Sequence, residues 1–363
     1  MKSRFLQLHI LTAYPPSNLN RDDLGRPKTA VVGGANRLRI SSQCLKRSWR
    51  GSSVFISTLD NALGKRTKLM GDEVFQSLVA SDIPEKDACK WAEKIIGKFG
   101  KVGADEKVEE EAPKKKRDKK ALLKQLVHFS PQEEDAIWEL VELVKSRKSE
   151  PTDNEVDSLP RREIKAADIA LFGRMLADSP EYNIEAAAQV AHAITTHRVA
   201  VEDDFFSAVD DLNQADERGS GHLGVHEFGS GLFYLYICIN REELKKNLQG
   251  DIELAKKSIE AFVEAAATVS PSGKQNSFAA LSRASYVLAE LGDDQPRSLS
   301  NAFFKPIEHT CDNTESESIR KLDSHRTALD RVYGSSTKAK VLNVMDPNSN
   351  TLKDIIDFSS GDE

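Results

Sequence analysis

The sequence has few cysteines and no long hydrophobic run. The four cysteines, Cys44, Cys89, Cys238 and Cys311, show no C-x-x-C spacing, which argues against a disulfide framework and against a zinc ribbon. No run of about 18 apolar residues is available to span a bilayer, and the N-terminus lacks the layout of a signal peptide. We therefore expect a soluble protein of the reducing cytoplasm with no membrane partner.

Familiar catalytic motifs are also missing. Neither the phosphate-binding motif G-x-x-x-x-G-K-[ST] nor the nucleophile motif G-x-S-x-G occurs. His222, His226 and Glu227 superficially resemble a zinc site, but H-E-x-x-H chemistry needs a helix, which the surrounding glycines oppose. We expect no metal and no cofactor, and a binding role is favoured over an enzyme. An RNA-cleaving enzyme with His9 or His197 as general base stays open.

Positive charge is concentrated at the start of the chain. The whole chain has a net charge of -6, whereas residues 1–50 hold ten lysines and arginines against two aspartates, a balance of +8. The remainder therefore carries -14. Such asymmetry favours a protein that binds nucleic acid along one localised track, although many basic surface helices serve only solubility.

Residues 36–50 read as a strand that leads into a helix with a basic stripe. At about 100° per residue, two opposite arcs form on this helix and its continuation. The arc facing solvent or phosphate holds Gln43, Lys46, Arg47 and Arg50, and the packing arc holds Leu45, Trp49, Phe55, Ile56 and Leu59. Ser41 and Ser42 occupy the expected N-cap, where hydroxyls and free amides also suit an anion.

The first strand and a helical insertion follow from hydrophobic spacing. Residues 4–13 alternate like a half-buried strand, with Leu6, Leu8 and Ile10 on one face. From about 60 to 195 the apolar residues recur every three or four positions. This spacing predicts helices at 85–99, 120–145, 164–177 and 184–195. Within the insertion, the charged block at 105–120 is predicted to be a surface linker.

Sheet character returns after the insertion, at 195–201 and 233–239. The acidic, aromatic and glycine-rich segment between these strands predicts a projecting hairpin or clamp. An amphipathic helix at 251–269 and a strand at 285–291 follow. Without the insertion and the hairpin, the order is close to βαββαβ, so we predict an α+β protein of the ferredoxin-like pattern that RNA-recognition modules share.

Several motifs, in the same order along the chain, resemble the CasC family, the repeated backbone subunits of the type I-E CRISPR surveillance complex Cascade. The motifs are Asn20-Arg-Asp-Asp23, Gly33-Gly34 to Arg50, Ala191-His-Ala-Ile-Thr-Thr-His197, Phe206-x-Ala-Val-Asp-Asp-Leu212, His222-Leu-Gly-x-x-Glu-Phe-x-Ser-Gly231 and Lys274-Gln. The resemblance extends from the first strand to about residue 305. Residues 100–160 and the tail beyond 335 match poorly.

The resemblance implies a hand-shaped protein. Its parts would be an RNA-recognition-like palm (1–59 and 233–363, with a polar C-terminal tail), helical fingers (60–194) and a thumb hairpin (195–232). Copies would stack along one CRISPR RNA, kink out bases at intervals and present the guide in segments for pairing with target DNA, together with other Cascade subunits. The family's backbone subunit is not a nuclease, and an RNA-processing endonuclease with a related fold is the alternative.

The resemblance also assigns roles to individual residues. The expected contacts to the RNA backbone are Arg21, Lys28, Ser41, Gln43, Lys46, Arg50 and Lys274. The expected wedge against a base consists of Phe205, Phe206 and Met175. Ordinary hairpin packing is the alternative for the two phenylalanines, and core packing on an apolar helix face is the alternative for Met175. Backbone contacts give affinity without sequence preference, as a guide of arbitrary sequence requires.

Overall fold

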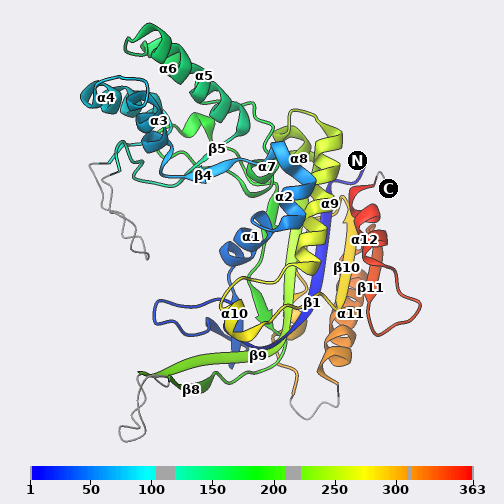
Figure 1. The fold of residues 1–363 in the computed structure, drawn as a ribbon. Helices are drawn as coiled ribbons and strands as arrows, with labels where there is room; N and C mark the ends of the chain where they lie inside the picture. The colour runs from blue at the N-terminus through cyan, green and yellow to red at the C-terminus, as the bar shows by residue number, and fades with distance from the viewer. Residues whose placement is uncertain (1, 104–118, 209–221, 309–312, 362–363) are drawn as a thin grey trace, which may run out of the picture. The chain divides into compact units, whose positions relative to one another are not determined.

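A computed structural model describes residues 2–103, 119–208, 222–308 and 313–361, and Figure 1 shows how its strands and helices are arranged. It contains a large antiparallel sheet with helices, so the predicted α+β class is confirmed. Residues 105–118 of the predicted charged linker and residues 209–221 of the predicted hairpin lie outside the described residues. Among the described residues, no helix is long and apolar enough to cross a membrane.

The main sheet joins strands that are far apart in sequence. Its path runs β11-β10-β1-β9-β7-β3-β2, and β6 and β8 each pair with β9. The bounds are β1 (Phe5–Ser17), β2 (Thr29–Val32), β3 (Ala35–Ile40), β6 (Ala188–Val190), β7 (Ala193–Thr195), β8 (Glu202–Ala208), β9 (His222–Asn240), β10 (Tyr286–Gly292) and β11 (Lys338–Asn343). β1 lies between β10 and β9 and is antiparallel to both.

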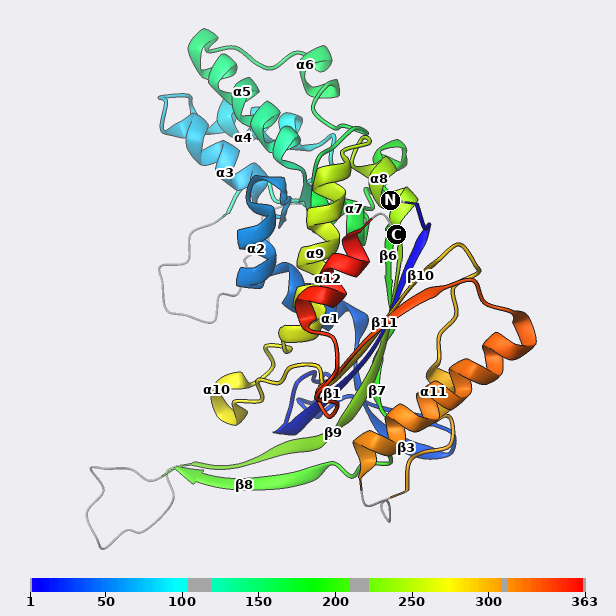
Figure 2. The same ribbon diagram turned by 90° about the vertical axis from the view of Figure 1, so that its right-hand side faces the viewer.

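Strand β1 is buried on both faces rather than half-buried as predicted. Leu6 and Leu8 are buried on one face, and Gln7 and His9 are buried on the other. The reason is that helices lie on both sides of the sheet, as Figure 2 shows: α11 (Thr314–Tyr333) covers one face, and α12 (Leu352–Ser360) lies on the other. Leu322 of α11 belongs to one apolar cluster with residues of β1, β9 and β10.

The same unit contains the helices that follow the strands. They are α1 (Ser42–Arg50), α2 (Ser53–Leu59), the second half of α9 (Ile252–Thr268), α10 (Gln275–Phe278), the short η3 (Ser300–Phe303), α11 and α12. The predicted amphipathic helix at 251–269 is therefore confirmed. The predicted continuation of the basic helix is interrupted at Gly51, so Ile56 is 49% exposed instead of packed. Residues 313–361 are ordered as α11, β11 and α12, which the prediction of a polar tail missed.

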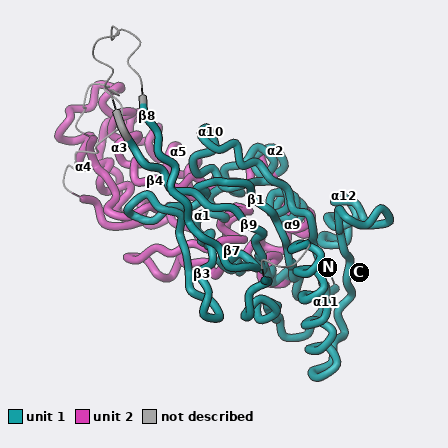
Figure 3. Tube along the Cα trace, turned by 90° about the horizontal axis from the view of Figure 1, so that it is seen from below, with its two compact units in different colours: residues 1–58, 188–241, 259–363 teal, residues 59–187, 242–258 magenta. Residues whose placement is uncertain are grey.

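The chain divides into two compact units, coloured separately in Figure 3. Residues 1–58, 188–241 and 259–363 form the unit with the large sheet, and residues 59–187 and 242–258 form the second unit. The second unit therefore includes 242–258, which the sequence prediction had assigned to the palm. Its elements are η1 (Asp60–Ala62), β4 (Lys65–Thr67), α3 (Met70–Val79), α4 (Glu85–Ile96), β5 (Val127–Phe129), α5 (Pro131–Arg147), α6 (Asp153–Asp157), α7 (Ala167–Phe172), η2 (Pro180–Tyr182), nearly all of α8 (Arg241–Asn247) and the start of α9.

Several predicted helices have different bounds in the structure. The helix predicted at 120–145 begins only at Pro131, where Ser130 and Glu133 form a capping box. The helix predicted at 164–177 ends at Phe172, because Gly173 adopts a φ of 81°. Residues 184–195 form no helix and supply β6 and β7, since pairing with β9 overrides the helix propensity of their alanines.

Candidate nucleic-acid interface

Helix α1 presents the predicted basic stripe because its other side is fixed in the core. Leu45 and Trp49 are buried, and the Trp49 ring meets the Phe262 ring of α9 edge-on at 5.2 Å between centroids. On the opposite arc, Gln43 and Arg47 are exposed, while Lys46 and Arg50 are half-buried. No acidic residue stands in the first turn of the helix. The predicted strand, helix and division into two arcs are confirmed for residues 36–50.

The chemistry of the stripe differs along its length. Burial lowers the pKa of Lys46, so its ammonium is already partly desolvated before any anion arrives. Ser41 is buried, and its hydroxyl accepts a hydrogen bond from the Cys44 N–H at 3.4 Å as the helix N-cap. Its own N–H donates to Asn20 Oδ1 at 2.8 Å. Ser41 therefore holds the helix start in place, which competes with its predicted role as a phosphate contact.

The loop that carries Arg21 and Lys28 lies beside the start of α1. Arg21 is exposed and pairs with Pro27 in an isolated bridge, and the half-buried Lys28 donates its N–H to Asn20 O at 2.8 Å. The loop is held to the base of the hairpin by an ion pair of 3.0 Å between Arg26 Nε and Glu227 Oε1. These contacts bring the two predicted cations next to the N-terminus of the basic helix.

A further cationic cluster lies at β3. Arg39 NH1 is 2.9 Å from His192 Nδ1. Burial lowers the pKa of His192, and the charges of Arg39 and Lys28 lower it further, which indicates a positive local potential. Arg37, by contrast, is fully buried and donates to the Thr195 and Phe303 carbonyls at 2.7 and 2.9 Å. Arg37 therefore connects segments within the core and is not part of the cationic surface.

Strands β8 and β9 form the predicted hairpin, whose two faces differ. The register pairs Phe205 with Val225, and both side chains are exposed, at 66% and 60%. On the other face, Phe206 pairs with Gly224 and stacks on the His226 ring, with 4.3 Å between centroids and 12° between planes. Phe205 thus presents an open aromatic surface, whereas one face of Phe206 is covered within the hairpin.

Lys274 reaches the hairpin from the segment before α10. Its backbone is left-handed, with φ 45° and ψ 33°, and its Nζ donates to His226 Nδ1 at 2.7 Å. The preceding Gly273 packs so closely that a Cβ there would lie 2.2 Å from the Leu19 carbonyl oxygen. The structure therefore brings Lys274 together with Phe206, and anchors its segment on the loop that precedes Arg21.

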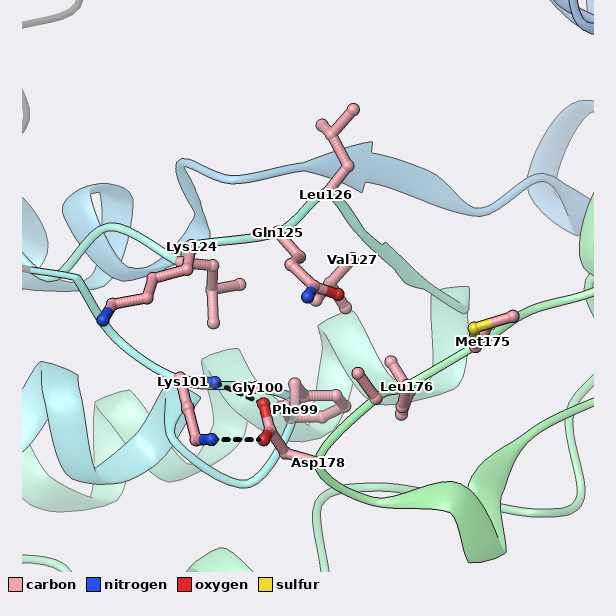
Figure 4. A pocket seen from close by; sticks show the side chains of 12 residues that line it. Phe99, Gly100, Lys101, Lys124, Gln125, Leu126, Val127, Met175, Leu176 and Asp178 are labelled. Carbon is pink, nitrogen blue, oxygen red and sulfur yellow. Dashed lines mark hydrogen bonds and ion pairs between the residues drawn. The ribbon is translucent and has the colours of Figure 1, made fainter.

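Met175 belongs to the second unit and is 79% exposed. It follows α7 rather than lying on a helix, so the alternative of core packing on an apolar helix face does not apply. As Figure 4 shows, it borders a cavity of about 230 Å³ whose walls come from residues 99–101, 123–127 and 175–178. Opposite Met175, Lys101 Nζ and Asp178 Oδ1 form an ion pair at 3.3 Å. Met175 is accessible, as a wedge residue must be.

The two histidines that the endonuclease alternative would use as general base, His9 and His197, both have partners at their two ring nitrogens. His9 is fully buried, with Nδ1 2.9 Å from the Tyr234 hydroxyl and Nε2 3.2 Å from Glu290 Oε2. Burial lowers the pKa of His9, against the raising effect of Glu290. Both ring nitrogens of His197 contact backbone groups, at 3.0 and 3.2 Å. In the part of the chain that the structure describes, no group of three or more His, Cys, Asp or Glu side chains could hold a metal ion.

The family model described as "CT1975-like protein" matches residues 6–358. The chain belongs to this family. Residues 100–160 and 336–358 lie within the matched range. No curated protein matches the sequence.

Two of the solved structures that resemble this chain match it over nearly its whole length. A chain of a "CRISPR RNA-guided surveillance complex, pre-nicking" is 28% identical with a TM-score of 0.82, covering 98% of this chain and 99% of that one. A chain of a "CRISPR RNA-guided surveillance complex" is 25% identical with a TM-score of 0.61, covering 98% of each chain. The family resemblance predicted from the motifs is confirmed.

The sequence analysis does not predict the polar and small residues that support the predicted contacts. Asn20 connects the loop to α1, and Gly224 leaves room for the Phe206 ring. The sequence analysis considers His226 only as a possible metal ligand. The alternation of side chains along a strand could have indicated these hairpin residues, because every second residue shares a face. The cross-strand register places Gly224 and His226 on the same face as Phe206.

Proposed function

We propose that the chain is a non-catalytic backbone subunit of a type I-E CRISPR RNA-guided surveillance complex. Copies of it bind one CRISPR RNA side by side, next to other Cascade subunits, and hold the guide in kinked segments for pairing with target DNA in antiviral defence. The observation that carries this proposal is the likeness to a surveillance-complex chain over 98% of the sequence. The basic arc of α1, on which Gln43 and Arg47 are exposed and Lys46 and Arg50 half-buried, supports it.

The cationic surface suits the backbone of the guide. Arg21, Lys28, Gln43, Lys46 and Arg50 come from one loop and one helix that hydrogen bonds hold together. Phosphate contacts of this kind give affinity that depends on salt and not on base sequence. Base pairing between guide and target then supplies the sequence recognition. The four central strands follow the order β10-β1-β9-β7, which supports an RNA-recognition-like palm.

The hairpin suits the kinking of the guide. Phe205 offers an exposed ring on one face of the hairpin, and the half-buried Phe206 stacks on His226 on the other. An aromatic ring accepts any base, with about 1–3 kcal/mol gained per stacked base. Met175, in the second unit, offers an exposed apolar side chain for the same purpose. In a filament, we infer that the hairpin of one copy meets the guide beside Met175 of the next copy.

A binding role accounts for the engaged histidines better than catalysis does. A general base must reach the proton that it abstracts, yet His9 has no exposed surface and bonds at both ring nitrogens. Purified protein incubated with repeat RNA is expected to leave the RNA intact. Cleavage that disappears in His9→Ala or His197→Ala would replace the proposal with the endonuclease.

The decisive test of the proposal is the salt dependence of RNA binding. Wild-type protein should copurify with RNA of uniform length and bind guides of unrelated sequence equally well. Lys46→Ala and Arg50→Ala should each weaken binding to all guides and lower the slope of log K against log salt by about 0.7 per subunit, the value for one single-strand phosphate contact.

Arg320→Ala provides the matched control, because it removes one exposed helix cation that already pairs with Glu317 at 2.6 Å. Its salt slope should equal that of wild type. A change in preference among guide sequences in the Lys46 or Arg50 variants, without a change of slope, would contradict the backbone-contact proposal.

A further inference from the structure

Arg39 and Lys28 are neighbouring cations in the sheet unit. Arg39 lies on β3, and its backbone N–H donates to the Lys28 carbonyl oxygen at 2.8 Å. Both residues are half-buried and line one small hollow. In the part of the chain that the structure describes, no ion pair joins either side chain to an aspartate or a glutamate. Neighbouring cations without a counter-charge repel each other, so an anion beside them would be stabilised.

The exposed ring of His192 contacts the Arg39 guanidinium from a fixed backbone. His192 lies between β6 and β7, where the Ala191 N–H donates to the Tyr236 carbonyl oxygen at 2.9 Å and Ala193 pairs with β3. Its Nδ1 is 2.9 Å from Arg39 NH1. Because a guanidinium only donates, Nδ1 is the acceptor and the neutral ring is protonated at Nε2.

The Arg39 guanidinium is held at two of its three nitrogens. Nε donates to the Thr29 carbonyl oxygen at 3.4 Å, and NH1 donates to His192. Among the described residues, NH2 has no hydrogen-bond partner. A carboxylate in place of His192 would orient the guanidinium and also cancel its charge, whereas a neutral imidazole orients it and leaves the charge in place. One charged donor nitrogen is therefore left to an anion from outside the chain.

Hydrogen bonds join Arg39 to the surface that the proposed function assigns to RNA. The Lys28 N–H donates to Asn20 O at 2.8 Å, and Asn20 Oδ1 accepts from the Ser41 N–H at 2.8 Å where α1 begins. We propose that Arg39 is a further contact to the phosphates of the guide RNA, and that His192 is a positioning residue that holds its guanidinium. The inference rests on the proposed function and adds two residues outside the expected contact set.

The test measures binding of the full chain to guide RNA without target DNA, over a range of salt concentrations. Arg39→Met keeps the half-buried stem and removes the charged head, so the slope of log K against log salt should fall by about 0.7 per subunit for every guide sequence. His192→Ala should weaken binding about three- to tenfold per subunit, the effect of losing one hydrogen bond. His192→Asn, whose Oδ1 can replace Nδ1 as the acceptor, should restore wild-type binding.

Three further variants keep the test decisive. Because His192 acts through Arg39, His192→Ala should weaken binding no further when Arg39→Met is already present. If Arg39→Met does not fold, Arg39→Gln keeps a donor to His192 without the charge and should show the same loss of slope. The matched control is Lys338→Ala, which removes an exposed cation from β11, at the other end of the strand order from β2 and β3, and should leave the slope unchanged.

Each part of the inference can fail separately. An unchanged slope in Arg39→Met and Arg39→Gln, or a loss that requires target DNA, would overturn the phosphate contact, while the slopes of Lys46→Ala and Arg50→Ala still tested the proposed function. An equal loss from His192→Ala with and without Arg39→Met, or a His192→Asn protein that binds as weakly as His192→Ala, would overturn the positioning role. Wild-type RNA binding that does not depend on salt would overturn the proposed function and the inference together.

Discussion

Replacing Glu290 with glutamine should destabilise the sheet unit at neutral pH and have much less effect in acid. The Glu290 carboxylate is fully buried on β10, where Arg297 NH1 and Arg326 Nε lie 3.0 and 2.8 Å from its two oxygens. His9 Nε2 lies 3.2 Å away. Glutamine preserves the size of the side chain but removes the charge that balances two guanidinium groups.

The magnitude follows from the pKa of Glu290. Burial alone would raise this pKa, but the hydrogen bonds and charges of His9 and Arg297 outweigh burial and lower it from 4.5 to about 2. At about 1.36 kcal/mol per unit, the ionised carboxylate contributes about 3 kcal/mol to the free energy of unfolding at pH 7. Because the folded pKa is the lower one, this contribution is complete above pH 4.5 and decreases as the pH falls towards 2, reaching about 1 kcal/mol at pH 3.

Urea unfolding can isolate the sheet unit. Of the three tryptophans only Trp49 lies in that unit, so Trp91→Phe and Trp138→Phe give a background whose fluorescence reports it. The wild-type and Glu290→Gln proteins should differ by about 3 kcal/mol at pH 7 and by about 1 kcal/mol at pH 3. The exposed pair of Glu317 and Arg320 supplies the control Glu317→Gln, expected to change little. Equal differences at both pH values would refute the reasoning.

Two glycine substitutions test close approaches of the backbone. Gly224→Ala should push Phe206 off His226, so the ring-current shift of the His226 ring protons in the NMR spectrum should disappear. The control Ser230→Ala, on the same strand, should preserve this shift. An unchanged shift in Gly224→Ala would exclude the stacked geometry. Gly33→Ala should destabilise the sheet unit by well over 1 kcal/mol, because its φ is 58° and a Cβ would lie 1.7 Å from the Phe304 carbonyl oxygen. Gly34→Ala is the matched control, because Gly34 has a φ of 75° but no atom lies within 4 Å of where its Cβ would be. Equal urea midpoints for the two variants would show that the Phe304 contact has no effect.

The basic helix could be predicted because its packing side is apolar and regularly spaced. Leu45 and Trp49 stand four residues apart and both are buried, so the position of Lys46 and Arg50 on the other side follows from the helix period. The hairpin could be predicted from its glycines and aromatic residues. The contrast between Phe205 and Phe206 could not, because it depends on the cross-strand register.

The C-terminal elements escaped prediction for a different physical reason. Only Ser318 and Leu322 are buried along α11, so its apolar period is weak. Besides Leu322, polar groups attach it to the sheet: Asp323 accepts from the Tyr286 hydroxyl at 3.1 Å, and Arg326 reaches Glu290. A helix held through ion pairs resembles a solvated segment when only hydrophobic spacing is considered. The same contacts help to bury the face of β1 that carries Gln7 and His9.

Strand β9 links the hairpin to the centre of the sheet. This single strand pairs with β8 at one end, and with β1 from Gly229 to Asn240. Since side chains alternate, inserting one residue between these two stretches would exchange the sides of Val225 and His226 relative to Leu235 and the core. Natural variation in the reach of such a hairpin should therefore occur in steps of two residues, or be accompanied by a compensating bulge like the irregularity between Tyr14 and Ser17.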